Sequence, residues 1–259
     1  MERFVNKNVF LTGAASGIGK ATARRLANEG AKLIIADVNQ KLLDETCNEL
    51  KDSVLETYAL DISNVNDVAK IFEDVKSRFK ALQALVNVAG ILRFDHSKDV
   101  EPKDWQKILD VNLTGTFFMC RYALPLIIES NGSIVNVSST AALGSHAWTA
   151  AYSASKGGIS AFSKTLAVEY GVQGVNVNCV CPASIETNMS TQTPLPSNID
   201  KRLLKKIMPV DGVNRTPEDI ASAIVFLASE DAVHINGIDL RVDGCLLYTS
   251  DAADDRLRV

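Results

Sequence analysis

A chain of 259 residues with 46% hydrophobic and 22% charged residues can bury one large core and remain in solution. Its net charge of −4 gives no electrostatic reason to expect a nucleic acid or an anionic membrane as a partner. No apolar stretch approaches the roughly 20 residues that span a bilayer, and the N-terminus lacks a secretory signal, so we expect a cytoplasmic protein. The five cysteines and three histidines are scattered, and we expect no metal site.

Short apolar runs alternate with amphipathic helical patterns along the chain. In chain order, the pattern predicts a strand at 9–11, a helix at 17–29, a strand at 32–36, a helix at 40–50, a strand at 54–60, a helix at 65–79, a strand at 84–87, a helix at 102–129, a strand at 133–137, a helix at 150–170, a strand at 175–180, an irregular segment with one short helix at 182–216, a helix after Pro217, and a strand at 238–241. This alternation predicts a single α/β domain with a Rossmann-like, doubly wound parallel sheet of about seven strands. Ligands of such sheets bind beyond the carboxyl ends of the strands.

Glycines are concentrated directly after the first strand, in Thr12-Gly13-Ala14-Ala15-Ser16-Gly17-Ile18-Gly19. They permit a tight turn and a close approach of the backbone to a pyrophosphate, and the following helix N-terminus offers free N–H groups. A lone glycine-rich turn could also serve S-adenosylmethionine or a flavin, or be structural. Here it lies in the strand–turn–helix context of a dinucleotide site.

Asp37 ends the second strand, about 20 residues further on, where a carboxylate can accept hydrogen bonds from the ribose hydroxyls of NAD. It would repel the additional phosphate of NADP, and Val38 and Asn39 follow it without an arginine. An ordinary turn aspartate is the alternative. Position and neighbours favour NAD over NADP.

Two further strand ends lie along the same edge of the predicted sheet. Asp61 and Ile62 follow the third strand, and Asp61 could cap the next helix and still contact adenine. The segment Asn87-Val88-Ala89-Gly90 follows the fourth strand, where Gly90 allows the backbone to pass close to a ligand. Each feature taken alone is as consistent with a structural role as with a functional one.

Tyr152 and Lys156 stand four residues apart on a predicted helix and therefore face the same direction. A neighbouring ammonium favours the phenolate, which would bring tyrosine into range for general acid–base chemistry. The preceding strand ends in Ser138-Ser139, and Ser139, with Ser138 as its rival, could polarise a carbonyl oxygen. Asn112 lies inside a long helix that asparagine disfavours, which indicates either a solvated position or a local perturbation whose amide holds a water behind the lysine.

Over residues 5–244 the sequence resembles the short-chain dehydrogenase/reductase family. The resemblance rests on the glycine-rich turn, Asn87-x-Ala89-Gly90, Asn112, Ser139 and Tyr152-x-x-x-Lys156, in the order and spacing of the family. Two positions depart from its usual pattern, Ala183 in place of glycine and Val88 in place of a frequent second asparagine.

The resemblance implies an NAD-dependent oxidoreductase in which Asn112, Ser139, Tyr152 and Lys156 form a catalytic tetrad. Tyr152 would remove the hydroxyl proton of a secondary alcohol while hydride passes to nicotinamide. Lys156 would also hold the ribose of the cofactor, and Pro182, Ile185 and Thr187 would hold its carboxamide end. The resemblance further implies a homotetramer built partly through the two long helices, and a substrate pocket walled by Leu143, His146 and Trp148 and covered by a loop over roughly 188–213.

Two other functions stay open at this point. An NADPH-dependent 3-oxoacyl carrier-protein reductase has the same tetrad, although Asp37 argues against its usual coenzyme. A catalytically inactive nucleotide sensor would belong to a different class of protein, and the intact tetrad argues against it.

The C-terminal segment differs in character from the rest of the chain. It begins Cys245-Leu246-Leu247-Tyr248-Thr249-Ser250-Asp251-Ala252-Ala253-Asp254, which resembles the in-frame translation of a transposase library adapter. We therefore expect residues 1–244 to form the dinucleotide-binding and catalytic domain and residues 245–259 to be a non-native tail.

Overall fold

The computed structural model describes residues 2–144, 146–204 and 209–249. Its centre is a wholly parallel seven-stranded sheet in the order β3-β2-β1-β4-β5-β6-β7, which confirms the predicted fold class. The strands are β1 (Asn8–Thr12), β2 (Lys32–Asp37), β3 (Val54–Ala59), β4 (Ala84–Asn87), β5 (Ser133–Val137), β6 (Asn176–Pro182) and β7 (Asp239–Val242). Strands β1 to β3 are added toward one edge of the sheet and β4 to β7 toward the other, so the strand order reverses between β1 and β4. Sheets of this kind open a crevice for ligands at this switch point.

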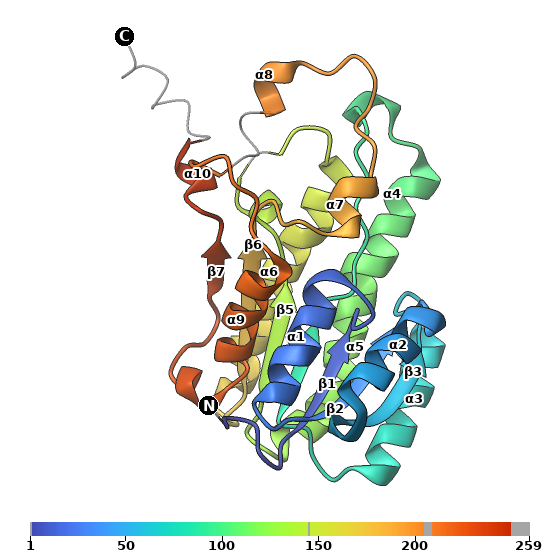
Figure 1. The fold of residues 1–259 in the computed structure, drawn as a ribbon, viewed down its shortest axis with the longest axis vertical. Coiled ribbons are helices and arrows are strands. Elements are labelled where there is room, and N and C mark those ends of the chain that lie inside the picture. Colours follow the sequence, from blue (N-terminus) through green and yellow to red (C-terminus); the bar gives the residue numbers. More distant parts are fainter. Residues whose placement is uncertain (1, 145, 205–208, 250–259) are drawn as a thin grey trace.

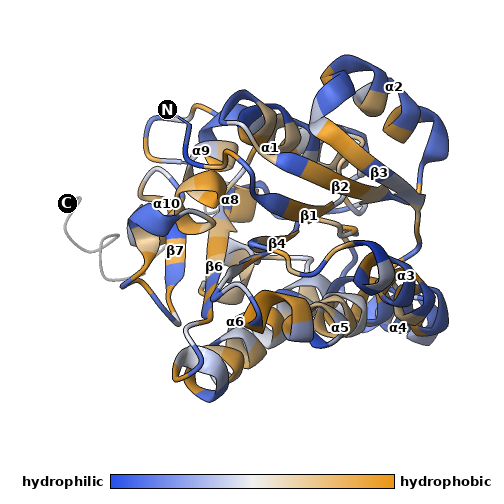
Figure 2. Ribbon diagram, turned by 90° about the horizontal axis from the view of Figure 1, so that it is seen from below, coloured by the Kyte–Doolittle hydropathy of each residue, from blue (hydrophilic) through white to orange (hydrophobic). Residues whose placement is uncertain are grey.

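Helices cover both faces of the sheet, so that the molecule has three layers, with the sheet in the middle (Figures 1 and 2). One face carries α1 (Gly17–Asn28), α2 (Gln40–Leu50) and α9 (Pro217–Leu227). The other carries α3 (Val65–Arg78), α4 (Pro102–Ile108), α5 (Thr116–Ile128) and α6 (Ala150–Gly171). Short 3₁₀ turns occur at Lys51–Ser53, Ser97–Asp99, Thr140–Ala142 and Glu230–Ala232.

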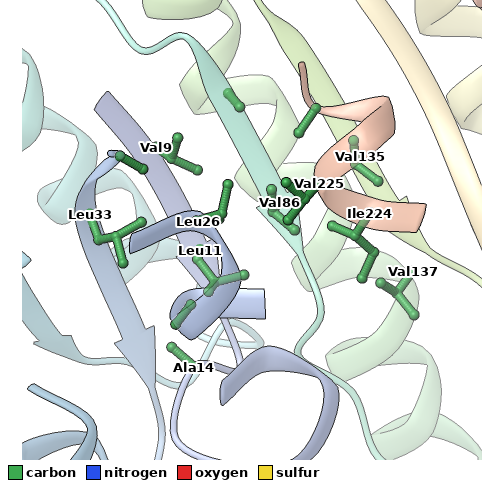
Figure 3. Close-up of a cluster of buried hydrophobic side chains, with 14 of the residues drawn as sticks. Val9, Leu11, Ala14, Leu26, Leu33, Val86, Val135, Val137, Ile224 and Val225 are labelled. Carbon is green, nitrogen blue, oxygen red and sulfur yellow. The ribbon is translucent and has the colours of Figure 1, made fainter. Parts of the chain in front are cut away.

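The core is divided by the sheet, because successive side chains of a strand point to opposite faces. Val9 and Leu11 of β1 pack toward α1 and α9, whereas Phe10 between them packs toward α3 and α5. Figure 3 shows the first side, where Leu26 of α1 and Ile224 of α9 approach the strand residues. Each of these side chains is fully buried, which contributes about 1.5–3 kcal/mol apiece. The strand ends are therefore presented by a rigid scaffold.

The predicted helix over 102–129 is one continuous helical rod with a π-helical segment, Leu109–Gly115, between α4 and α5. The expected perturbation around Asn112 is thus present as a widened turn. The expectation that no apolar stretch approaches the length of a bilayer span is wrong, because this rod is long and apolar enough to cross a membrane. Half of its most apolar 18-residue stretch is buried inside the protein.

The described residues between 182 and 216, which leave out 205–208, contain two short helices, α7 (Asn188–Gln192) and α8 (Lys201–Leu204), where the sequence predicted one. Thr187 and Ser190 form a capping box at the start of α7, and the Asp200 carboxylate accepts the backbone N–H of Arg202 in α8. Both helices lie at the end of the molecule opposite the N-terminus (Figure 1).

Candidate active site

One cleft of about 600 Å³ follows the carboxyl ends of β1 to β6. Nearly all residues that the sequence placed at the cofactor or the reaction line it, although they come from distant parts of the chain. They are Gly13, Ser16, Gly17, Ile18, Gly19, Asp37, Val38, Asp61, Ile62, Ala89, Gly90, Ser139, Tyr152, Lys156, Pro182, Ile185 and Thr187. Asn87 and Asn112 lie behind the lining. Of the three residues expected to wall the substrate pocket, His146 lines the cleft, whereas Leu143 and Trp148 do not.

The turn between β1 and α1 fits a pyrophosphate. Gly13 has a φ of 69°, and a Cβ there would lie 2.8 Å from the Ala89 nitrogen. A Cβ at Gly19 would lie only 1.9 Å from the carbonyl oxygen of Gly13. Helix α1 begins after Ser16 with no side-chain cap and no acidic residue in its first turn. Its N–H groups and positive dipole end are therefore available to an anion.

Asp37 links the ends of β1 and β2. Its Oδ2 accepts the Ala15 N–H at 3.0 Å and its Oδ1 accepts the Asn39 N–H at 2.9 Å. A carboxylate oxygen accepts more than one hydrogen bond, so both remain able to receive ribose hydroxyls. Val38 beside it is 72% exposed, and no arginine is among the described residues that line the cleft.

Asp61 does not cap the following helix, so that expectation is wrong. Its Oδ1 accepts the backbone N–H of Ser63 at 2.9 Å and the Ser63 hydroxyl at 2.7 Å, which closes a local turn. Asn64 is the N-cap of α3, with its side chain accepting the Asp67 N–H. Asp61 and Ile62 nevertheless line the cleft at the end of β3.

The Asn87 side chain lies inside the protein rather than in the cleft. Its Nδ2 donates to the Asn136 Oδ1 at 2.8 Å and thus joins β4 to β5. The end of β4 is also tied to β1, because the Thr12 hydroxyl accepts the N–H groups of Val88 and Ala89 at 3.1 and 3.3 Å. Asn87 therefore positions the cleft-lining Ala89 and Gly90 from behind.

Tyr152 and Lys156 lie on one face of α6, as their spacing predicted. The Lys156 Nζ lies 5.7 Å from the centre of the Tyr152 ring and donates to the Val137 carbonyl at 2.7 Å. Burial lowers the pKa of Lys156 to about 8. Burial also raises the pKa of Tyr152, and a side-chain hydrogen bond with Ser139 offsets part of that rise. The sequence predicted the opposite net direction for this tyrosine, because it could not weigh burial against the ammonium.

The two serines after β5 have different surroundings. The Ser138 hydroxyl lies 3.0 Å from the Lys156 carbonyl oxygen, to which it donates, and 3.0 Å from the Ser160 hydroxyl. Ser138 is thus engaged with the backbone and side chains of α6. Ser139 instead pairs with Tyr152 and accepts the Ala141 N–H at 3.1 Å. Of the two, Ser139 has the geometry for a role beside the tyrosine.

Asn112 in the π-helical segment is fully buried. Its Oδ1 accepts the Ile91 N–H at 2.8 Å, and its Nδ2 donates to the Ile91 carbonyl at 2.9 Å and to the Ser155 hydroxyl at 3.1 Å. Both amide hydrogens are thus used within the protein, so the expectation that this amide holds a water behind Lys156 is not met. The side chain instead fixes the segment after β4 against α6.

The residues that follow β6 form one wall of the cleft. Ile185 forms an isolated parallel bridge with Arg215, and the Ala183 N–H donates to the Val242 carbonyl at 3.2 Å. Thr187 approaches the glycine-rich turn, because a Cβ at Gly17 would lie 3.2 Å from its methyl group. The segment that leads into α7 therefore packs on the cofactor half of the cleft.

Several lining residues were not predicted. Lys107 and Val111 enter from α4 and the π-helical segment, and Ile91, Leu92 and Phe94 extend the lining beyond Gly90. The rule that ligands sit at strand ends could have included the latter three. Lys107 and Val111 carried no such signal, because they lie one helical turn apart on a helical stretch that does not follow a strand.

A parallel sheet with this strand order, a glycine-rich turn, and a tyrosine, lysine and serine in one cleft defines a nicotinamide-dependent dehydrogenase or reductase. The family model described as "Enoyl-(Acyl carrier protein) reductase" matches residues 13–246. The chain belongs to the short-chain dehydrogenase/reductase family and is an enzyme whose named relatives are dehydrogenases and reductases that act on CH–OH groups.

Curated relatives and a solved structure agree with this assignment. A meso-2,3-butanediol dehydrogenase from Serratia marcescens is 34% identical over 242 residues, covering 93% of this chain and 95% of the relative. A D-threitol dehydrogenase from Mycolicibacterium smegmatis is 36% identical over 245 residues, 93% of either chain. The structure of 3-ketoacyl-(acyl-carrier-protein) reductase from Brucella melitensis complexed with NADH has a TM-score of 0.83 at 32% identity, covering 93% of this chain and 98% of that chain.

Proposed function

We propose that this enzyme transfers hydride between a secondary alcohol or its ketone and NAD, with Tyr152 as general acid and base. The observation that carries the proposal is that one cleft joins Asp37 at the adenosine end to Tyr152 and Ser139 at the other. The nicotinamide ring would accept or supply the hydride.

The preference for NAD rests on the charge around Asp37. Its carboxylate would meet the additional phosphate of NADP, with Val38 beside it and no arginine among the lining residues of the described chain to neutralise that phosphate. A relative crystallised with NADH supports this preference.

The site residues divide the chemistry among themselves. Tyr152 would give its proton to the carbonyl oxygen during reduction, the protonated form being favoured by burial, which raises its pKa. In oxidation it would take the hydroxyl proton, and the hydrogen bond from Ser139 would stabilise the resulting phenolate. Lys156 would add positive charge beside the ring and bind ribose hydroxyls. Asn112 would act by positioning the segment around Ile91 against α6, through its hydrogen bonds to the Ile91 carbonyl and the Ser155 hydroxyl.

A 3-oxoacyl carrier-protein reductase is the second candidate. The similarity to the 3-ketoacyl-(acyl-carrier-protein) reductase from Brucella melitensis favours it. It differs from the first in a substrate carried on a thioester and in an expected preference for NADPH, which the NADH-bound Brucella relative does not support.

Titration of the purified protein with NADH and with NADPH, followed by coenzyme fluorescence, tests the coenzyme. Tighter binding of NADH supports the proposal, and tighter binding of NADPH would put the carrier-protein reductase first. Turnover of a secondary alcohol by Tyr152→Phe is expected to fall by about 10²–10⁴-fold, the usual contribution of general acid–base catalysis. Full turnover by this variant, with unchanged NADH binding as the folding control, would refute the role of the tyrosine, whereas a wild type that binds NADH but turns over no alcohol or ketone would favour the sensor.

We further propose a cytoplasmic homotetramer. Helices α5 and α6 form an apolar groove of about 530 Å³ with Phe117, Gly158 and Phe162 among its lining residues. Val168 on α6 and Val172 directly after the helix are 82% and 90% exposed. Exposed apolar surface of this kind is typical of a subunit contact.

The described part of the C-terminal segment is consistent with a foreign junction. Cys245 has a φ of 65°, a conformation that favours glycine, directly after Gly244. The segment folds back onto the protein through α10 (Leu246–Thr249), with Leu246 buried and the Tyr248 hydroxyl accepting a hydrogen bond from Arg241. We propose that residues 245–259 are non-native and weaken assembly. Light scattering of the protein with and without them tests this, and the same assembly in both would count against it.

A further inference from the structure

His146 is an imidazole in the substrate half of the cleft to which the mechanism assigns no role. It lines the cleft together with Ser139 and Tyr152 and follows Thr140–Ala142, the 3₁₀ turn after Ser139. Burial lowers the pKa of His146, so the ring is neutral and carries a single proton. Which ring nitrogen bears that proton decides what the residue can offer a substrate.

The hydrogen bonds of Thr140 identify the protonated nitrogen. The Thr140 Oγ1 lies 3.1 Å from the Pro182 carbonyl oxygen and 3.3 Å from the His146 Nε2. A carbonyl can only accept, so the one hydroxyl proton of Thr140 goes to Pro182. The Thr140 oxygen then accepts from His146, whose proton must be on Nε2. Nδ1 is therefore left as a hydrogen-bond acceptor.

The neighbourhood of the ring gives this acceptor few alternatives. Among the described residues next to it along the chain, Thr149 is already engaged, because its hydroxyl donates to the His146 carbonyl at 2.9 Å and pairs with the Ser153 hydroxyl. The segments that close this half of the cleft contribute apolar side chains, among them Leu92, Phe94 and Met189. When a substrate displaces the water that hydrogen-bonds to Nδ1, the free energy of binding is less favourable unless the substrate donates a hydrogen bond in its place. Substrates that carry such a donor are therefore favoured.

We propose that His146 determines substrate specificity by accepting, at Nδ1, a hydrogen bond from a second hydroxyl on the carbon next to the reacting one. The substrate class is then a vicinal diol, oxidised to an α-hydroxy ketone. Thr140 acts through His146, as the residue that fixes its tautomer. This inference rests on the proposed alcohol dehydrogenase activity and adds to it the class of alcohol.

The test compares 2,3-butanediol with 2-butanol at saturating NAD and reads the ratio of their kcat/KM values. The wild-type ratio is expected to favour the diol by about tenfold or more, the usual effect of one hydrogen bond whose partner is otherwise unpaired. His146→Leu, which keeps an apolar wall but removes both ring nitrogens, is expected to lower the ratio by about tenfold. Thr140→Val is expected to lower it as well, whereas Thr140→Ser, which retains the hydroxyl, is expected to keep it.

NADH binding measured on every variant separates a lost substrate contact from a misfolded protein. A diol preference that persists in His146→Leu while NADH binding is intact would overturn the inference, as would a wild-type enzyme that shows no diol preference. A ratio equally low in Thr140→Ser and Thr140→Val would overturn the role given to the Thr140 hydroxyl. Failure of the wild type to bind either coenzyme would instead overturn the proposed function.

Discussion

Lys156 should give the stability of this enzyme a measurable dependence on pH. Its pKa falls from 10.5 in an unfolded chain to about 8 in the folded protein because burial penalises the ammonium. At about 1.36 kcal/mol per unit of pKa, this shift corresponds to about 3 kcal/mol. Below pH 8 both states are charged and the folded state bears the full penalty. Between pH 8 and 10.5 the unfolded chain binds more protons, so the contribution of this group to stability rises with pH.

Urea unfolding of the wild type and of Lys156→Met, a variant of similar side-chain length, isolates this effect. The free energy of unfolding of the wild type relative to the variant is expected to rise by about 2–3 kcal/mol between pH 7 and pH 10. Lys164 on the same helix provides the control, because its hydrogen bond to Asp239 raises its pKa. The comparison of Lys164→Met with the wild type should show no such rise.

The reasoning would be refuted by pH profiles of the wild type and Lys156→Met that run parallel within about 0.5 kcal/mol. In that case the ammonium would be as well solvated in the cleft as in the unfolded chain, and burial could not account for its altered pKa. Measurement at a single protein concentration keeps subunit association from contributing to the difference.

Three further predictions follow from the glycines, the tail and the groove. Gly19→Ala would place a Cβ 1.9 Å from the Gly13 carbonyl oxygen and should abolish detectable NADH binding. Gly157→Ala, whose added Cβ would meet nothing within 4 Å, should raise the free energy of unfolding by up to about 1 kcal/mol in thermal unfolding. An alanine at position 19 that binds NADH normally would contradict the close approach. Cys245→Gly should stabilise the chain by about 1 kcal/mol in the same assay, because it relieves a positive φ, and a loss of stability would argue against strain there. Phe117→Glu should shift light scattering toward smaller assemblies, and an unchanged mass would exclude the groove as a subunit contact.

The sheet could be predicted closely because strands buried on both faces are continuous apolar runs bounded by polar residues. The predicted bounds of β4 and β5 agree with the structure at both ends. β6 continues two residues beyond its prediction to Pro182, which pairs with Val242 of β7. Proline is disfavoured inside a central strand because it lacks an N–H, so the pairing of Pro182 with β7 could not be anticipated from the apolar pattern.

The site was predictable in its residue types but not in the directions of its side chains. Adjacent serines after a strand point to opposite sides, and nothing local indicates whether Ser138 or Ser139 faces the cleft. The partners of Asn112 lie 21 and 43 residues away, so its clamp on Ile91 and Ser155 is a property of the assembled fold. Burial, which sets the direction of the Tyr152 pKa, is likewise absent from a sequence pattern.

The π-helical turn at Leu109–Gly115 sets the phase between the two ends of the long rod. Each residue of an α-helix advances the rod by about 100°, so deletion of one residue from the widened turn would rotate α5 by about that angle relative to α4. Either Asn112 would then turn away from Ile91, or the side of α5 that packs on the sheet would turn toward solvent. Substitutions can therefore accumulate along this helix, but its length in residues is fixed jointly by the cleft at one end and the core at the other.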